Sequence, residues 1–231
     1  MFHPLPPEDI RELEKTQPVI IVPFREQLQQ KRGEQLQKFL KHFEKLPVKI
    51  LVVEQTEEKK FNRGALLNIG AKESKNDYVI FHDVDLLPKK EILPYYAVFP
   101  EHPIHIGKAW SQKYDMSTFL GGVISISLAD LKKINGFPNN FWGWGGEDDA
   151  MRERFKQHDI KVFQPTSRTG FRELKHVDTK SNPEWKNMEK WEGMALEKAG
   201  KNKSGYKNVK YSILSEEKLS TNANKITVQI L

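Results

Sequence analysis

Cysteine is absent from the 231-residue sequence, and so is any apolar run that approaches the roughly 20 residues needed to span a bilayer. The absence of cysteine excludes disulfides and zinc-thiolate sites, and it suits a reducing compartment. Residues 1–9 combine prolines with acidic residues, and they lack the basic start and apolar stretch of a secretory signal. We therefore expect a cytoplasmic protein without a membrane helix.

The formal net charge is +6 and the isoelectric point is about 9.2, which allows a nucleic acid, an anionic membrane surface or a phosphorylated small ligand as partner. Much of the excess charge lies in residues 198–210, where lysines alternate with glycine, asparagine and serine and not with aromatic residues that stack on bases. We expect no nucleic-acid partner. The lysines indicate either a solvated surface or peripheral contact with an anionic membrane.

Strands and helices alternate over the first half of the sequence. Residues 18–23, 48–53 and 78–81 are short apolar runs typical of buried strands. The segments between them, 27–45 and 62–72, carry apolar residues at helical spacing. This order predicts an α/β fold with a Rossmann-like, mostly parallel sheet flanked by helices. Ligands are then expected beyond the carboxyl ends of the strands.

The second half continues with shorter elements. We predict a strand over 122–127, helices over 128–134 and 147–157, an extended segment at 161–163 and a helix from Asn182 to Gly200. The length of the chain favours a single domain. We assign residues 1–17 to an N-terminal extension, 18–200 to the main domain and 201–231 to a basic C-terminal segment that packs on the same domain.

Two aspartates separated by one residue, Asp83 and Asp85, follow the third predicted strand. Carboxylates at a sheet edge can hold a hard divalent cation through their oxygens. An Asp-x-Asp pair is common, however, and the two residues can also be turn residues that bond to backbone amides. The apolar strand 78–81 favours the metal site, because it delivers both acids to the edge where ligands bind.

A second motif is the segment Phe141-Trp-Gly-Trp-Gly-Gly-Glu-Asp-Asp149. Its glycines let other groups approach the backbone closely, its indoles offer flat apolar faces that suit sugar rings, and its acids stand at a predicted helix start. This combination points to carbohydrate binding. The competing interpretation is a glycine-rich turn with two core tryptophans and an acidic helix N-terminus that the helix dipole stabilises.

Four segments in sequence order carry a resemblance to a known family. They are Phe61-Asn-Arg-Gly-Ala-Leu-Leu-Asn68, Phe81-His-Asp-Val-Asp-Leu86, Gly121-Gly122 and Ile134-Asn-Gly-Phe-Pro-Asn-Asn-Phe-Trp-Gly-Trp-Gly-Gly-Glu-Asp-Asp149. Together they closely resemble the β-1,4-galactosyltransferases, from about Pro18 to about His176. The resemblance implies a GT-A fold for residues 18–200 and a Mn²⁺ or Mg²⁺ cofactor. It also implies a UDP-sugar donor, usually UDP-galactose, and a saccharide or lipid-linked saccharide acceptor.

The resemblance also implies roles for single residues. On the donor side it places Pro23, Phe24, Arg25, Phe61, Arg63, Asp83, Val84 and Trp144. On the acceptor side it places Trp144, Glu147, Asp149 and Phe119. Asp148 matches the catalytic base, Asp85 matches a metal ligand, and Trp144 corresponds to a mobile tryptophan that closes over both substrates.

The second metal region departs from the family pattern. Family members supply a histidine after a strand, with methionine or another histidine a few positions earlier, whereas this sequence reads Phe171-Arg-Glu-Leu-Lys-His176. We assign His176 as a ligand and Glu173 as its partner, a harder ligand that still suits Mn²⁺ or Mg²⁺. The competing interpretation of a lone histidine is a surface residue or a hydrogen-bonded core residue.

Phe119 stands two residues before Gly121-Gly122, where galactose-transferring members of the family usually carry tyrosine and members that accept N-acetylgalactosamine carry a smaller residue. It keeps the bulk of tyrosine without the hydroxyl, and therefore favours galactose. Animal members also have an anchoring helix and disulfides that this sequence lacks. This difference suggests a bacterial or viral relative with a different acceptor.

The expected reaction is transfer with inversion, in which Asp148 removes the proton of the acceptor hydroxyl as it attacks the anomeric carbon. A divalent cation at Asp85 and His176, with Arg25 or Arg63, would stabilise the departing diphosphate. One alternative is a non-catalytic module of the same fold that binds sugar nucleotides or glycans. Another is a nucleotidyl or phosphoryl transfer enzyme that uses Asp83 and Asp85 on two metals, which leaves the Trp-Gly-Trp loop unexplained.

Overall fold

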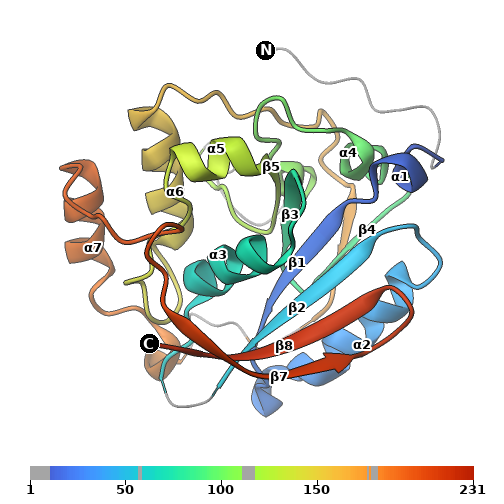
Figure 1. Cartoon of the computed structure of the whole chain (residues 1–231), viewed down its shortest axis with the longest axis horizontal. Coiled ribbons are helices and arrows are strands. Elements are labelled where there is room, and N and C mark those ends of the chain that lie inside the picture. The colour runs from blue at the N-terminus through green and yellow to red at the C-terminus, as the bar shows by residue number, and fades with distance from the viewer. Residues whose placement is uncertain (1–10, 57–58, 111–117, 176, 178–181) are drawn as a thin grey trace.

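A computed structural model shows the fold of residues 11–56, 59–110, 118–175, 177 and 182–231, which are the residues that the structure describes. Its central sheet has six strands in the order β5-β3-β1-β2-β8-β7 (Figure 1). The parallel strands are β1 (Val19–Phe24), β2 (Lys49–Gln55), β3 (Tyr78–His82) and β8 (Ala223–Ile230). The edge strands β5 (Val123–Ser127) and β7 (Tyr211–Lys218) are antiparallel to their neighbours. The predicted mostly parallel sheet is confirmed.

Helices cover both faces of the sheet. One face carries α1 (Arg11–Thr16), α2 (Arg32–Phe43) and α4 (Pro94–Ala97), and the other carries α3 (Arg63–Glu73), α5 (Leu128–Lys133) and α6 (Glu147–Gln157) (Figure 1). Each face of the sheet has its own hydrophobic core, and successive residues of β1 point into the two cores alternately. Ile20 lies in the same core as Phe39 of α2, and Ile21 lies in the same core as Leu66 of α3. The whole strand is buried, because side chains alternate between faces that are both covered.

Shorter elements complete the fold. A second sheet pairs β4 (Leu86–Pro88) with β6 (Phe171–Glu173) in antiparallel fashion. The described residues also form the 3-10 helices η1 (Leu28–Gln30), η2 (Ile106–Ala109) and η4 (Pro183–Trp185). The helix α7 (Lys190–Lys198) packs against α6.

Two predicted helices are shorter than expected. The segment 27–45 divides at Lys31, whose left-handed φ of 56° separates η1 from α2. The segment 182–200 divides at the extended residue Lys186, so that η4 and α7 are separate elements. At 161–163 the structure has an isolated bridge from Phe163 to Ile104 and no longer strand.

The sequence analysis did not predict the strands of the C-terminal segment. β8 pairs with β2 over six residues, and its buried residues Ile226, Val228 and Ile230 alternate along the strand as in a half-buried strand. β7 is exposed along almost its whole length, and its second half, Ser215 to Lys218, is polar. Residues 211–230 are therefore part of the central sheet.

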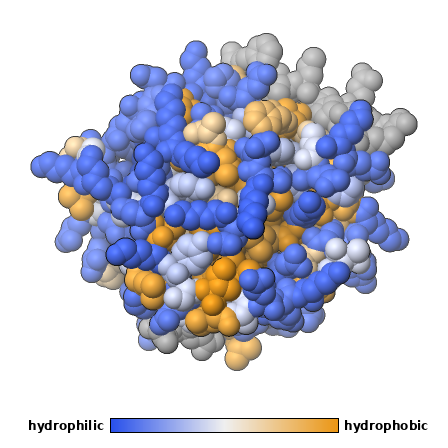
Figure 2. All heavy atoms as spheres, viewed as in Figure 1, coloured by the Kyte–Doolittle hydropathy of each residue, from blue (hydrophilic) through white to orange (hydrophobic). Residues whose placement is uncertain are grey.

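The surface is mainly hydrophilic on the face shown in Figure 2, where hydrophobic atoms appear in separate areas. Among the residues that the structure describes, no helix combines the length and the apolar character that crossing a membrane requires.

Candidate active site

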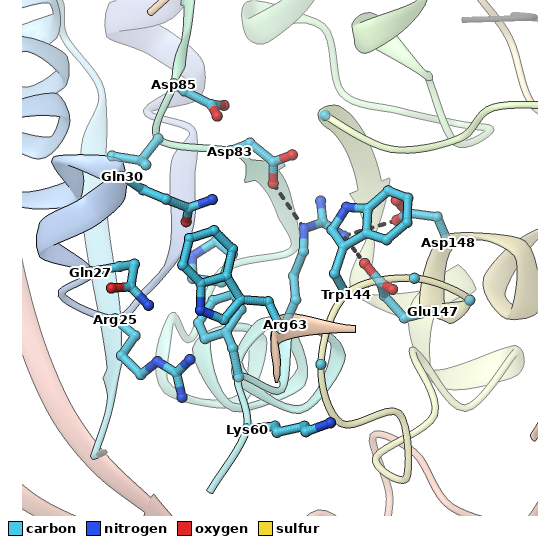
Figure 3. Close-up of a pocket in the computed structure, with 18 of the residues that line it drawn as sticks. Arg25, Gln27, Gln30, Lys60, Arg63, Asp83, Asp85, Trp144, Glu147 and Asp148 are labelled. Carbon is cyan, nitrogen blue, oxygen red and sulfur yellow. Dashed lines mark hydrogen bonds and ion pairs between the residues drawn. The ribbon is translucent and has the colours of Figure 1, made fainter. Parts of the chain in front are cut away.

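A cavity of about 520 Å³ lies at the carboxyl ends of the parallel strands. Arg25 follows β1, and Asp83 and Asp85 follow β3. The beginnings of α3 and α6 bring Arg63 and Glu147 to the same place (Figure 3). Parallel strands end at one edge of a sheet, so these side chains converge although they are far apart in the sequence.

All but one of the site residues predicted from the sequence line this cavity. They are Asp148, Asp85, Glu173, Pro23, Phe24, Arg25, Phe61, Arg63, Asp83, Val84, Trp144, Glu147, Asp149 and Phe119. His176, the predicted second metal ligand, lies outside the described residues. The structure thus brings the predicted residues together, while their individual roles stay predictions.

Two buried asparagines connect the sequence motifs that build the site. Asn62 caps α3 by accepting a hydrogen bond from Ala65 N, and its amide donates to the carbonyl of Asn139 at 2.7 Å. Six residues later, Asn68 donates to the carbonyl of Phe137 and accepts from its N–H. These bonds fix the chain that leads into the tryptophan loop against α3. The motif 61–68 is therefore needed to position the motif 134–149.

Arg63 is the centre of the charged part of the site (Figure 3). Its Nε lies 2.8 Å from Asp83 Oδ1 and its Nη1 lies 2.8 Å from Asp148 Oδ1. Glu147 Oε1 is 3.7 Å from the same Nη1. Burial alone would lower the pKa of Arg63, but the charges of Asp148, Asp83 and Glu147 outweigh that effect and raise it. The guanidinium is therefore permanently charged and holds three carboxyl groups from two motifs.

Two of these carboxyl groups have raised pKa values. Burial, together with the charge of Asp148, raises the pKa of Glu147. Burial also raises the pKa of Asp83, and the charges of Asp85 and Asp148 add to this while Arg63 opposes it. The cavity thus holds more carboxyl groups than Arg63 alone compensates, and additional positive charge would be favourable there.

Asp85 has its own cationic partner. Its Oδ2 lies 2.9 Å from Arg32 Nη1, and both side chains are largely buried. Gln30 and Gln35 accept hydrogen bonds from Arg32 at 3.1 and 2.9 Å. The Asp85 carboxylate is thus already compensated by a positively charged group that other buried side chains hold in place.

The two-stranded sheet brings Asp85 close to the predicted metal region. Leu86 pairs with Glu173 across β4 and β6, and Leu174 N donates to the carbonyl of Asp85 at 2.7 Å. Asp85 and Glu173 both line the cavity. Among the described residues, no three His, Asp or Glu side chains gather closely enough to hold a metal ion. The described part of the region therefore supplies carboxylate oxygens from two neighbouring segments.

The tryptophan loop bridges two other segments. Gly143 N donates to the carbonyl of Phe61 at 2.8 Å, which attaches the loop to the motif 61–68. Trp144 N donates to the carbonyl of Trp185 at 2.6 Å and its own carbonyl accepts from Asn187 N at 3.0 Å. The Trp144 side chain is 40% exposed at the cavity. The loop therefore presents an indole face to the cavity.

Phe119 forms part of the cavity wall beside the buried His105 and the partly buried Trp110. Its ring has edge-to-face contacts with His105 and Trp110, at centroid distances of 5.7 and 6.2 Å. His105 Nε2 lies 2.9 Å from the carbonyl of Gly121, which fixes the chain just after Phe119. This wall reaches Asp148, because a Cβ atom on Gly121 would meet the Asp148 carboxylate.

Comparisons with known proteins identify the family. A family model described as the N-terminal region of glycosyl transferase group 7 matches residues 5–97, and one described as the N-terminal domain of galactosyltransferase matches residues 101–177. The β-1,4-galactosyltransferase 7 of Mus musculus is 34% identical over 244 residues, which cover 96% of this chain and 70% of that protein. The chain belongs to the β-1,4-galactosyltransferase family. The resemblance found in the sequence is confirmed.

A solved structure of the family supports the fold. The crystal structure of a mutant Drosophila β-1,4-galactosyltransferase 7, in complex with manganese, UDP-Gal and xylobiose, has a TM-score of 0.77 and 27% identity, with 92% of this chain and 93% of that chain covered. The GT-A fold is therefore confirmed. The Homo sapiens β-1,4-galactosyltransferase 7 is 34% identical over 90% of this chain. The chain spans 65% of the length of that human relative.

The sequence analysis did not predict several residues that line the cavity of this member of the galactosyltransferase family. They are Gln27, Gln30, Arg32, Lys60, Trp110, Trp185 and Lys190. Lys60 directly precedes the motif 61–68, so its position could have indicated it. Trp185 was placed inside a predicted helix. Arg32 carries no local signal, because it reaches Asp85 only through the tertiary fold.

Proposed function

We propose that this protein is an inverting, metal-dependent glycosyltransferase that moves galactose from UDP-galactose to a hydroxyl of a saccharide acceptor. The observation that carries the proposal is that Asp85 and Asp148, from segments more than 60 residues apart in the sequence, line one cavity. Arg63 links the two segments through its contacts with Asp83 and Asp148. The Drosophila relative in complex with UDP-Gal, manganese and xylobiose supports the same chemistry.

The proposed donor site is the basic and aromatic side of the cavity. Arg25 packs over the ring of Phe61 at 5.6 Å and donates to the carbonyl of Lys59. This contact leaves a cationic and a flat apolar group side by side, which suits the diphosphate and the uracil ring of UDP. Lys60 lines the same wall and donates to the carbonyl of Lys186 at 3.0 Å. The donor would thus be bound between the α3 motif and the segment that holds the tryptophan loop.

The donor set fits a hard divalent cation. Asp85 and Glu173 are carboxylates at the cavity, and oxygen ligands are those that Mg²⁺ and Mn²⁺ prefer. Arg32 already neutralises Asp85, so a cation at this carboxylate would have to displace that guanidinium. When bound, the cation would supply electrostatic stabilisation of the diphosphate. We propose Asp85 as a ligand, and Glu173 and His176 as its partners.

Asp148 is the proposed base. Arg63 holds one of its oxygens, Oδ1, and thereby orients the carboxylate. The other oxygen, Oδ2, lies beside the backbone of Gly121, where a side chain at position 121 would meet it. Removal of the proton from the acceptor hydroxyl by Asp148, as that hydroxyl attacks the anomeric carbon, requires no covalent intermediate. Trp144 would cover the reacting groups and exclude water.

The acceptor is proposed to be a saccharide. Trp110, Trp144 and Trp185 line the cavity, and indole faces stack on sugar rings. The xylobiose in the Drosophila relative is a saccharide of this kind. A lipid-linked acceptor, a bacterial or viral origin and a cytoplasmic location stay predictions from the sequence.

We also propose contact with an anionic membrane through α7. Trp191 in α7 and Met188 just before α7 are 73% and 74% exposed, and Lys198, Lys201 and Lys203 are exposed further along the sequence. Exposed indole and thioether groups among lysines suit an anionic interface. Trp191→Ser should weaken binding to vesicles that contain phosphatidylserine, whereas Leu28→Ser, at a side chain 83% exposed, should not. Equal binding to phosphatidylcholine vesicles would count against this contact.

The test of the proposed reaction measures UDP release from UDP-galactose with Mn²⁺, with and without xylobiose. Asp148→Asn should lower turnover at least about a hundredfold and leave UDP binding intact. Asp159→Asn is the matched control, because Asp159 is exposed after α6 with a left-handed φ of 52° that asparagine tolerates. Binding of UDP-galactose without any release of UDP would instead favour the non-catalytic module.

A further inference from the structure

Arg32 forms an ion pair with Asp85, the carboxylate that the proposed function assigns to the metal. The Arg32–Asp85 pair is close, at 2.9 Å, and the two side chains are only 19% and 13% exposed. A carboxylate withdrawn from water in this way needs a positive partner, and an ion pair in such a setting is screened little by solvent. The pair is therefore a strong contact at the site itself.

Buried glutamines hold Arg32 in that place. Gln30 and Gln35 are 6% and 2% exposed, and each accepts a hydrogen bond from the guanidinium. Their amide groups in turn donate to the carbonyls of Val177 and Lys175, at 3.2 and 3.4 Å. Arg32 is thus built into a polar cluster that spans from α2 to the chain after β6. A surface arginine that met Asp85 by chance would have no such support.

A guanidinium and a divalent cation compete for one carboxylate. A metal ion on Asp85 would lie within a few ångströms of Arg32, where two positive charges repel each other strongly in a partly desolvated site. Either the metal binds weakly or Arg32 leaves Asp85. A diphosphate offers Arg32 a new partner, because a guanidinium binds phosphate oxygens through two parallel hydrogen bonds.

We propose that Arg32 is a built-in counter-cation of Asp85, which weakens metal binding to the empty protein and makes that binding depend on the nucleotide diphosphate. This inference rests on the proposed function. Without UDP, Arg32 remains on Asp85 and the metal must displace it. With UDP, the diphosphate attracts Arg32, and Asp85 becomes available. Metal and nucleotide then strengthen each other's binding by more than their direct contact provides.

The experiment titrates Mn²⁺ into the purified full chain with and without UDP and measures unbound Mn²⁺ by electron paramagnetic resonance. Arg32→Gln and Arg32→Met remove the charge, and two different replacements guard against a folding defect of one side chain. Arg32→Lys keeps the charge. Lys31→Gln is the matched control, because Lys31 is the neighbouring residue, is 68% exposed and pairs with Glu34.

In the wild-type protein, UDP should tighten Mn²⁺ binding by roughly tenfold or more. Both neutral variants should bind Mn²⁺ about tenfold more tightly than the wild type in the absence of UDP, and UDP should then improve binding much less. Arg32→Lys and Lys31→Gln should stay close to the wild type. Folding of each variant is verified by its melting temperature.

Two results would overturn the inference, and they differ in what else they affect. If Mn²⁺ binds the wild type but no more tightly to the folded neutral variants, or if Lys31→Gln has the same effect, Arg32 is not the competing cation and the proposed function stands. If Mn²⁺ does not bind the wild type even with UDP, the metal-dependent function itself is wrong.

Discussion

Gly121 lies directly against the carboxylate of Asp148. A Cβ atom at position 121 would meet Asp148 Oδ2, and it would lie 2.7 Å from the ring of Phe119. The φ angle of Gly121 lies outside the left-handed region, so the backbone itself tolerates an alanine. Position 121 therefore requires glycine because Asp148 and Phe119 leave no space for a side chain, and not because of its backbone conformation.

Gly121→Ala should lower turnover at least about tenfold, because displacement of a reacting carboxylate by about 1 Å can reduce the rate a hundredfold. Binding of UDP should change less than turnover, because the atoms nearest to the added methyl group belong to Asp148 and Phe119. Steady-state kinetics with UDP-galactose, together with calorimetry of UDP binding, test both parts. Normal turnover in a folded variant would show that Asp148 has more room than the structure indicates.

Arg63→Met should destabilise the fold by about 3 kcal/mol, because it leaves Asp83, Glu147 and Asp148 uncompensated in a buried site. Urea unfolding at pH 7 measures the free energy. Arg152→Met is the control, because Arg152 pairs with a half-exposed Asp149 at 3.2 Å and such pairs contribute at most about 1 kcal/mol. Equal losses in the two variants would contradict a special role for Arg63.

His105 should make stability depend on pH. Burial lowers the pKa of His105 to about 4, below the value of 6.5 for an exposed histidine. The folded state therefore favours the neutral ring. The contribution of His105 to the free energy of unfolding is complete above pH 6.5 and is lost as the pH falls toward 4. At pH 5 this loss amounts to something on the order of 1 to 2 kcal/mol.

The His105 prediction is tested by comparing variants, because other groups titrate too. The raised pKa of Glu147 has the opposite effect, since the contribution of Glu147 to the free energy of unfolding is lost as the pH rises. His105→Gln keeps a donor for the carbonyl of Gly121 and should flatten the fall in unfolding free energy between pH 7 and pH 5. His102→Gln, at an exposed histidine, should leave the slope unchanged. Identical slopes in both variants would refute the assignment.

Phe119→Leu should broaden the choice of donor. The ring of Phe119 fills the wall between Trp110 and His105, and a smaller side chain leaves room for an acetamido group. We expect the preference for UDP-galactose over UDP-N-acetylgalactosamine to fall by about tenfold or more in kcat/KM. Competition between the two donors, with separation of the products, measures this ratio. An unchanged ratio would place the discriminating contact elsewhere.

The sequence predicted the parts of the fold that depend on local pattern. Strands such as 18–23 and 78–81 are continuous apolar runs because both faces of the sheet are covered. The first leads to Arg25, and the second leads to Asp83 and Asp85. The helix over 147–157 agrees with α6 residue for residue. The motif residues therefore met in one cavity as predicted.

The remaining features depend on tertiary contacts. The exposed strand β7 has no apolar face to reveal it, and it forms only because β8 provides a partner. The break at Lys31 depends on a left-handed residue that is not glycine, which sequence pattern does not mark. Arg32 then reaches Asp85 across 53 positions of sequence. Contacts of this kind become visible only in three dimensions.

The position of β8 affects how the chain folds during synthesis. β8 lies between β2 and β7 in the sheet although it comes from the end of the described chain. While the ribosome is still making residues 223–230, the backbone groups along the outer side of β2 have no neighbouring strand. A nascent chain in this state exposes a strand edge that other chains can join. Chaperone contact with emerging chains should therefore be strongest before residues 223–230 leave the ribosome.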